Sequence, residues 1–208
     1  MIKNIIFDIG NVLLEFKPLN YLKRTFNNDT LEKFLYKEIF QSQEWLQLDR
    51  GTLTQEQAIK LISLRNPTYE MHIVKCMDNW LDILVPIEGT VKILNQLKEK
   101  GYKLYLLSNF HSLAFETICS KYDFFNHFDG GIISYKENLL KPESEIYTKL
   151  LDTYKLTAEE CLFIDDTLAN IEAANVLGIK TLHFESATHV ASGIFEPLST
   201  LEKYKSIK

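Results

Sequence analysis

The sequence has few of the residues that interrupt regular structure, with 8 glycines and 5 prolines among 208 residues. It has no internal repeat, low-complexity tract or Pro/Gly-rich linker, which excludes solenoid, fibrous and largely disordered chains. Its 3 cysteines lie far apart, without CxxC or Cys/His spacing, so we expect reduced core thiols rather than disulfides or zinc ligands. A hydrophobic content of 46% is that of an ordinary globular protein.

Positive charge is not in excess, since the formal net charge is -5 and the pI is about 5.6. This balance argues against a general binder of nucleic acid or membrane surfaces, although a local cationic pocket could still hold an anion. No apolar run approaches the length of a membrane span, and Asp8 arrives before a signal-peptide apolar region could develop. We therefore expect a cytoplasmic protein without nucleic-acid or membrane partners, as a monomer or weak homodimer.

The stretch around which the chain is organised is residues 3–16, with the sequence KNIIFDIGNVLLEF. Residues 5–7 form an apolar run typical of a buried parallel strand, and this run ends at Asp8, with Gly10 close behind. In an open α/β sheet the carboxyl ends of the strands are where ligands bind. Asp8 is therefore placed for chemistry, although Asp at a strand end also suits a turn or a helix cap.

Residues 17–86 follow a different pattern, with apolar residues at helical spacing and few β-rich runs. Thr54 and Gln57 have the spacing of a capping box, directly after a turn at residues 49–51. We expect a helical domain here, inserted into an α/β core domain of residues 1–16 and 87–208.

In the core, strands and helices alternate, which predicts a parallel sheet with helices on both faces. Pro142 is expected in the first turn of a helix at about residues 143–154. The expected strands are residues 5–7, 102–107, 131–134, 161–164 and 179–184, and the expected helices are residues 89–100, 114–122, 143–154 and 171–177.

Polar groups follow three of the expected strands: Asp8 after the first, Ser108 and Asn109 after the second, and Asp165 and Asp166 after the fourth. Their strand ends share one edge of the sheet, where the carboxylates would repel one another and stay partly protonated unless a cation joined them. Mg²⁺ is the natural partner, because it prefers oxygen ligands and is usually bound by one or two carboxylates plus a substrate phosphate.

Lys141 adds a positive charge at an expected helix start, where a phosphoryl group would need one, and Ser108 adds a hydroxyl. Each residue alone has a simpler explanation. The acids could cap a helix, Ser108 and Asn109 could form a turn, and Lys141 could be a solvated surface lysine. Their joint placement at the ends of the right elements favours phosphate chemistry.

Four segments resemble the four motifs of the haloacid dehalogenase superfamily: FDIGNV (residues 7–12), LLSN (106–109), KPESEIY (141–147) and FIDDTLANIEAA (163–174). The insert also lies where that family carries its cap domain. The resemblance implies a Rossmann-like sheet of strand order 3-2-1-4-5. It is strongest to a phosphatase branch whose first motif reads DxGNV, which includes enzymes acting on sugar phosphates such as glucose 1-phosphate.

The resemblance implies a Mg²⁺-dependent phosphatase for a small phosphorylated metabolite, with a sugar phosphate as the expected substrate. Asp8 would be the nucleophile and form an aspartyl-phosphate, while Ser108 and Lys141 would hold the phosphoryl oxygens. The implied metal ligands are Asp8, the backbone carbonyl of Gly10, and the pair Asp165 and Asp166. Asp166 is the expected direct ligand, and Asp165 would act through water or orient Lys141; Asn170 would orient the acidic loop.

Phosphate or substrate contacts are also expected from Asn109 and, in the insert, from Trp45 and Arg50. Trp45 fits core packing equally well, and Arg50 with Asp49 also fits a surface pair.

The sequence departs from the family at Gly10, where most of its phosphatases have a second aspartate that serves as general acid and base. General acid–base help is typically worth ~10² to 10⁴ in rate. Three explanations stay open: a substrate with a better leaving group, a substitute acid such as Glu15 or Asp49, or weak activity.

Two other functions compete with a phosphatase. Metal-free dehalogenases of the superfamily also lack the second aspartate, but they have no use for the adjacent pair Asp165 and Asp166. A catalytically silent binding or regulatory protein could also keep the fold, because a fold alone does not establish activity.

Overall fold

The computed structural model describes residues 1–194, and its centre is a five-stranded sheet of order β3-β2-β1-β4-β5. Every neighbouring pair of strands is parallel. The strands are β1 (Asn4–Phe7), β2 (Lys103–Ser108), β3 (Gly130–Ile133), β4 (Cys161–Asp165) and β5 (Lys180–His183). The predicted α/β class and strand order are therefore confirmed.

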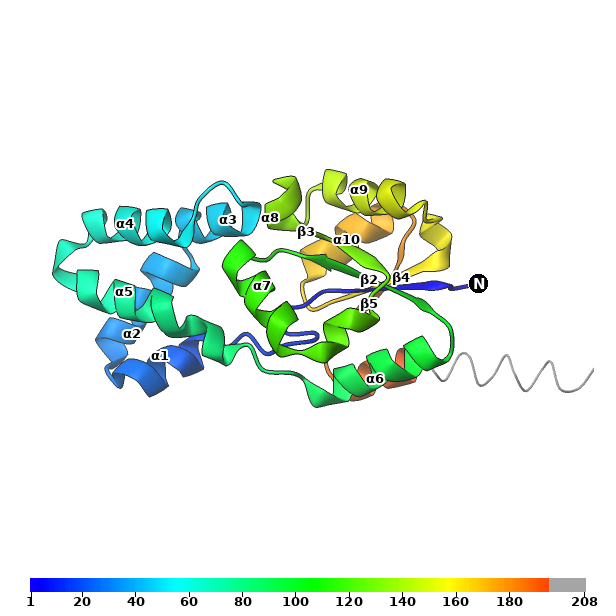
Figure 1. Cartoon of the computed structure of the whole chain (residues 1–208), viewed down its shortest axis with the longest axis horizontal. Coiled ribbons are helices and arrows are strands. Elements are labelled where there is room, and N and C mark those ends of the chain that lie inside the picture. Colours follow the sequence, from blue (N-terminus) through cyan, green and yellow to red (C-terminus); the bar gives the residue numbers. More distant parts are fainter. Residues whose placement is uncertain (195–208) are drawn as a thin grey trace, which may run out of the picture.

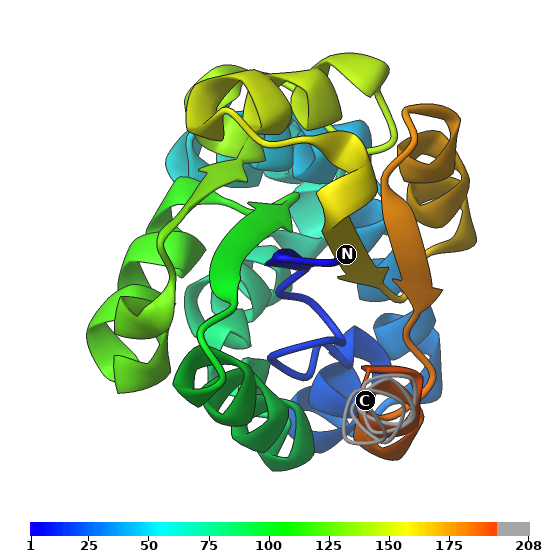
Figure 2. The same cartoon turned by 90° about the vertical axis from the view of Figure 1, so that its right-hand side faces the viewer.

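Helices cover both faces of the sheet (Figures 1 and 2), as a parallel sheet requires. Ile5 and Phe7 of β1 join the hydrophobic core on one face, and Ile6 joins the core on the other. All of β1 is buried because it is the central strand, so Ile5, Ile6 and Phe7 are apolar without alternation. The covering helices are α6 (Glu88–Glu99) and α7 (Ser112–Lys121) on the first face, and α9 (Ser144–Tyr154) and α10 (Leu168–Val176) on the second.

Between β1 and α6 the chain forms the helices at the left of Figure 1. They are α1 (Pro18–Phe26), α2 (Asp29–Leu35), α3 (Gln43–Arg50), α4 (Gln55–Arg65) and α5 (Glu70–Asn79), with a π-helical turn at Tyr36–Phe40 and short 3₁₀ turns at Pro67–Tyr69 and Trp80–Ile83. The predicted capping box is present at the start of α4, where Thr54 and Gln57 each accept a backbone N–H of the other. One hydrophobic core contains both insert residues such as Trp80 and sheet residues such as Ile5. The division at residues 17 and 86 into two domains stays a prediction.

Several element boundaries differ by a few residues from those expected. Helix α9 begins at Ser144 with Glu143 as its N-cap, so Pro142 precedes the helix instead of lying in its first turn. Strand β3 ends at Ile133 because Ser134 begins the short helix α8 (Ser134–Glu137). Helix α10 begins earlier than expected, at Leu168. This leucine is exposed, so the spacing of the buried apolar residues does not reveal the first turn.

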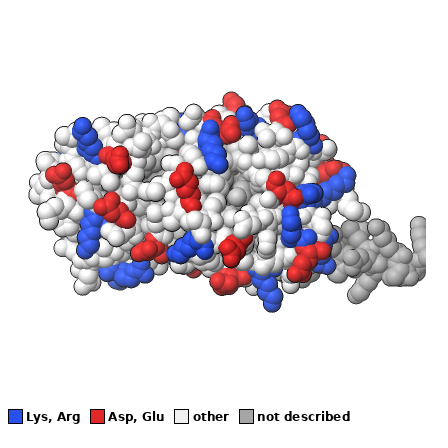
Figure 3. All heavy atoms as spheres, in the orientation of Figure 1, with Lys and Arg blue, Asp and Glu red and all other residues white. Residues whose placement is uncertain are grey.

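The structure shows where the charged side chains and the cysteines lie. On the face in Figure 3, acidic and basic side chains alternate without a large area of one sign. The three cysteines are free, and Cys76 and Cys161 are buried. Over residues 1–194, no helix combines the length and the apolar character that crossing a membrane requires.

The insert meets the sheet domain at the end of α3, where Gly51 is the C-cap residue. Gly51 has a φ of 76°, in the left-handed region that glycine adopts readily. A Cβ atom at this position would lie 2.2 Å from the carbonyl oxygen of Tyr135 in α8. The close approach of α3 to α8 therefore requires glycine both for its backbone conformation and for its lack of a side chain.

We predict that Gly51→Ala destabilises the fold more than Gly101→Ala. Gly101 has a similar φ of 85°, but a Cβ atom there would meet nothing within 4 Å among the described residues. The control should therefore cost only the conformational penalty of about 1 kcal/mol, whereas Gly51→Ala adds a clash with backbone. Urea unfolding of both variants measures the difference, and equal losses would contradict the close approach.

Candidate active site

The polar residues expected at the strand ends lie together, because β1 pairs with β2 on one side and with β4 on the other. Asp8 directly follows β1, Ser108 is the last residue of β2, and Asp165 is the last residue of β4. All three are buried. The sheet thus brings a carboxylate, a hydroxyl and a second carboxylate to one edge from positions that span most of the sequence.

Lys141 lies between the two carboxylates. Its Nζ atom is 2.9 Å from Oδ1 of Asp8 and 2.6 Å from Oδ2 of Asp165. Lys141 is only 5% exposed, so it is not a solvated surface lysine. Burial by itself would lower the pKa of Lys141, but the charges of Asp8 and Asp165 raise it above its usual value. The lysine is therefore charged and held in place by two acids.

Asn109 fixes the segment that carries Lys141. Its side-chain Oδ1 accepts from the backbone N–H of Lys141 at 2.8 Å, and its Nδ2 donates to the backbone carbonyl of Lys141 at 3.0 Å. Both ends of the amide are engaged, so the side chain of Asn109 holds the lysine loop to the end of β2. This contact was not predicted, because nothing in the sequence links residues 109 and 141.

The two acids after β4 have different surroundings. Asp165 is fully buried and accepts from the Nδ2 of Asn170, from the backbone N–H of Thr167 and from Lys141. Asp166 is less buried and accepts from Nδ2 of Asn11 at 3.1 Å and, over a longer 3.4 Å, from Oγ1 of Thr167. The oxygens of Asp165 are thus committed to protein donors, while those of Asp166 are more available to a ligand.

Asp8, Asp165 and Asp166 can hold a cation together. One carboxylate oxygen from each lies within 4.8 Å of the others. Three carboxylates supply the hard oxygen donors that Mg²⁺ prefers, with room left for waters and a phosphate oxygen. The residues present therefore fit a magnesium ion.

The pKa of Asp8 is raised to about 7, and burial is the main cause. The charge of Lys141 opposes this rise, and the charge of Asp165 adds to it. Asp8 is thus a buried carboxyl group held beside a cation, an arrangement in which its pKa is set by burial and by neighbouring charge.

Ser108 is 1% exposed, and its Oγ atom makes no hydrogen bond of good geometry within residues 1–194, although it lies near enough to Asp8 to lower the pKa of that carboxyl group. A buried hydroxyl without a partner costs free energy, of order 1–3 kcal/mol. Such a group at the site edge is suited to a ligand that supplies the missing bond.

Trp45 and Arg50, the two insert residues expected to contact substrate, both have protein partners. Trp45 packs in an aromatic cluster with Phe16, Trp80 and His111, whose ring lies 4.3 Å from that of Trp45. Arg50 pairs with Glu143, rather than with Asp49, through both of its terminal nitrogens. The substrate contacts predicted for Trp45 and Arg50 stay predictions, and these side chains already have protein partners.

Asp49, at the end of α3, faces the end of β2. Its Oδ1 atom lies 3.2 Å from Nε2 of His111, which follows Ser108 by three residues. Burial raises the pKa of Asp49 to about 8, and the charge of Asp8 adds to this rise while that of Lys141 opposes it. The sequence offered no reason to single out His111, because a lone histidine after a strand carries no motif.

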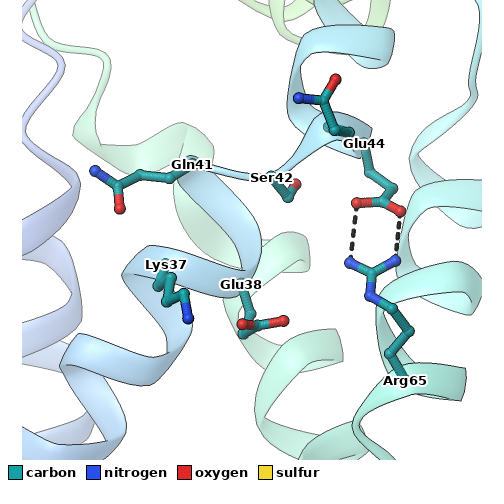
Figure 4. A pocket seen from close by; sticks show the side chains of 7 residues that line it. Lys37, Glu38, Gln41, Ser42, Glu44 and Arg65 are labelled. Carbon is teal, nitrogen blue, oxygen red and sulfur yellow. Dashed lines mark hydrogen bonds and ion pairs between the residues drawn. The ribbon is translucent and has the colours of Figure 1, made fainter.

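The insert also has a polar hollow at the opposite end of α3 (Figure 4). It is lined by Lys37, Glu38, Gln41, Ser42, Gln43, Glu44 and Arg65. Arg65 makes two hydrogen bonds to the carboxylate of Glu44, and Glu38 accepts from Asn66. None of the residues at the strand ends lines this hollow.

The fold and the site define a Rossmann-like α/β protein with an acidic cluster and a buried lysine at the carboxyl edge of its sheet. Residues 2–178 match the family of haloacid dehalogenase-like hydrolases, and the chain belongs to this family of enzymes.

Two curated relatives match most of the chain. Sesquiterpene phosphatase astK of Aspergillus oryzae is 25% identical over 181 residues, covering 87% of this chain and 89% of that protein. D-ribitol-5-phosphate phosphatase of Bacteroides thetaiotaomicron is 26% identical over 201 residues, covering 89% and 93%. A haloacid dehalogenase family enzyme from the same organism, crystallised with magnesium and inorganic phosphate, is similar with a TM-score of 0.70 at 26% identity, covering 89% and 96%.

We predict that Mg²⁺ binds to the native protein and that Asp166→Asn weakens this binding by at least about 10-fold, because outer-shell partners of a metal alone are worth that much. Isothermal calorimetry measures the affinity. The matched control is Asp152→Asn, an exposed aspartate of α9, which should bind Mg²⁺ like the native protein. Equal affinity in all three proteins would exclude Asp166 as a ligand.

Proposed function

We propose that this protein is a Mg²⁺-dependent phosphatase that hydrolyses a small phosphomonoester through an aspartyl-phosphate on Asp8. The observation that carries the proposal is the contact of Lys141 with both Asp8 and Asp165 inside a cluster of three carboxylates. A buried cation beside a nucleophile and a magnesium site is the arrangement that phosphoryl transfer needs, because the reaction depends on positioning and on stabilising charge.

In this mechanism, an oxygen of Asp8 attacks phosphorus and the bond to the leaving oxygen breaks. Lys141 and the hydroxyl of Ser108 hold the phosphoryl oxygens, and the burial of Ser108 close to Asp8 supports this role. Water then attacks the aspartyl-phosphate, which releases inorganic phosphate and restores Asp8.

We assign the magnesium ligands to Asp8, the backbone carbonyl of Gly10 and Asp166, with Asp165 orienting Lys141. This division is supported by the hydrogen bonds of Asp165, whose oxygens already accept from protein donors. When bound, Mg²⁺ would neutralise charge on the phosphoryl group and on the nucleophile.

For the substrate we propose a sugar phosphate or a related polyol phosphate. The DxGNV form of the first motif supports a glucose-1-phosphatase-like branch, and the similarity to D-ribitol-5-phosphate phosphatase supports a polyol phosphate. A metal-free dehalogenase is less well supported, because that reaction has no use for the carboxylate of Asp166.

We predict that the native protein releases phosphate from phosphomonoesters with Mg²⁺, and that EDTA or Asp8→Asn reduces the release to background. The amide of asparagine keeps the size of the side chain but is a far weaker nucleophile. A colorimetric phosphate assay over sugar phosphates and one aryl phosphate measures both effects. A folded protein that releases nothing from any of them would refute the proposal and favour a dehalogenase or a silent binding protein.

We also predict that Arg50→Ala raises KM for a sugar phosphate more than for a small aryl phosphate, as expected if Arg50 contacts the non-reacting part of the substrate. Glu143→Gln is the matched control, since it removes the charge that pairs with Arg50 and keeps the arginine. Steady-state kinetics on both substrates measure the split. If the two variants behave alike, Arg50 acts through Glu143 and not through the substrate.

A further inference from the structure

The family's usual proton donor is missing at Gly10, but the space for one is not filled. A Cβ atom at Gly10 would meet nothing within 4 Å among residues 1–194. The backbone there is outside the left-handed region that favours glycine, since no positive φ occurs at this residue. The absence of a side chain is thus not imposed by packing, and another group can supply the proton.

Asp49 is the carboxyl group of the insert that lies against the site. Its side chain is 15% exposed, and its Oδ1 is 3.2 Å from Nε2 of His111. The charges of Asp8 and Lys141 both shift its pKa. Glu15, the other candidate acid, is more exposed and pairs with Lys17 at 2.7 Å. Asp49, in contrast, lies near enough to Asp8 and Lys141 for their charges to act on its pKa.

We propose that Asp49 is the general acid and base of this phosphatase, delivered to the site by helix α3 in place of the aspartate that Gly10 lacks. This inference rests on the proposed phosphatase function.

The end of α3 is fixed to the sheet domain at several points. The Oγ of Ser134 donates to the backbone carbonyl of Asp49 at 2.5 Å and accepts from the N–H of Phe110 at 2.9 Å. The next residue, Arg50, pairs with Glu143, and the backbone carbonyl of Arg50 accepts from Nδ2 of Asn138. These contacts fix the backbone at Asp49, from which its carboxyl group reaches His111 just beyond the end of β2.

The surroundings of Asp49 suit a proton donor. Burial is the main cause that raises the pKa of Asp49 to about 8, which favours the protonated carboxyl group at neutral pH. The imidazole of His111 is neutral there, because burial lowers its pKa to about 3. Nε2 of His111 lies 3.2 Å from Oδ1 of Asp49, but no hydrogen bond of good geometry joins this nitrogen to a described residue.

The proton balance closes over one turnover. As Asp8 attacks phosphorus, the bond between phosphorus and the leaving oxygen breaks, and the proton of Asp49 moves to that oxygen to form an alcohol. The Asp49 carboxylate then takes a proton from the water that attacks the aspartyl-phosphate. Inorganic phosphate leaves, and Asp8 and protonated Asp49 are restored.

The test compares two leaving groups in the native protein and in Asp49→Asn, using kcat/KM with Mg²⁺. Ribitol 5-phosphate has an alkyl leaving group that needs protonation, whereas dinitrophenyl phosphate has one that does not. We expect Asp49→Asn to lower kcat/KM for ribitol 5-phosphate by ~10² to 10⁴ and to leave that for dinitrophenyl phosphate unchanged. Equal losses on both substrates, or no loss on ribitol 5-phosphate, would overturn the assignment.

Two further variants sharpen the result. Glu15→Gln should leave both rates unchanged, and a selective loss there would move the role to Glu15. Gly10→Asp in the Asp49→Asn background should restore turnover of ribitol 5-phosphate, because position 10 has room for the side chain. A native protein that releases no phosphate from dinitrophenyl phosphate would overturn the phosphatase function itself, which separates that failure from a failure of Asp49 alone.

Discussion

The structure depends on one buried charge contact, in which the ammonium of Lys141 bridges the carboxylates of Asp8 and Asp165. These residues come from the ends of β1 and β4 and from the loop before α9, so the contact joins three separate parts of the chain. Removing one partner of a buried pair leaves an uncompensated charge, at a cost of about 3–5 kcal/mol. Asn109 and Asn170 complete the network by holding the lysine loop and the acid. The proposed chemistry and the packing of these three parts of the chain therefore depend on the same interactions.

Helix α3 couples the insert to this network. Its last residues contact α8, Glu143 and His111, each of which is fixed to the sheet domain, and Gly51 allows the close approach. Because Asp49 belongs to the insert, its carboxyl group would complete the proposed site only when the insert lies against the sheet. Water would then be excluded from the site while the proton donor is in place.

Much of the fold could be predicted from local pattern. Apolar runs ending in acids predicted β1 and β4, and the alternation of strands and helices predicted a parallel sheet, because both patterns reflect burial on the two faces. The meeting of Asp8, Ser108 and Asp165 followed from the shared edge of parallel strands. Boundaries were less predictable: α10 begins at Leu168, an apolar residue that is exposed and so lies outside the buried face of the helix.

The sequence by itself determined the class of fold, the order of the motifs and the residue types at each strand end, because these depend on local hydrophobic periodicity and on chain order. Only the tertiary structure decided which polar side chains contact one another. In the fold, Asn109 hydrogen-bonds to Lys141, Arg50 pairs with Glu143 at a separation of 93 residues, and Asp49 lies beside His111. Such contacts depend on how the insert packs against the sheet. Burial and neighbouring charge then set the protonation of Asp49, and neither can be read from residues next to it in the chain.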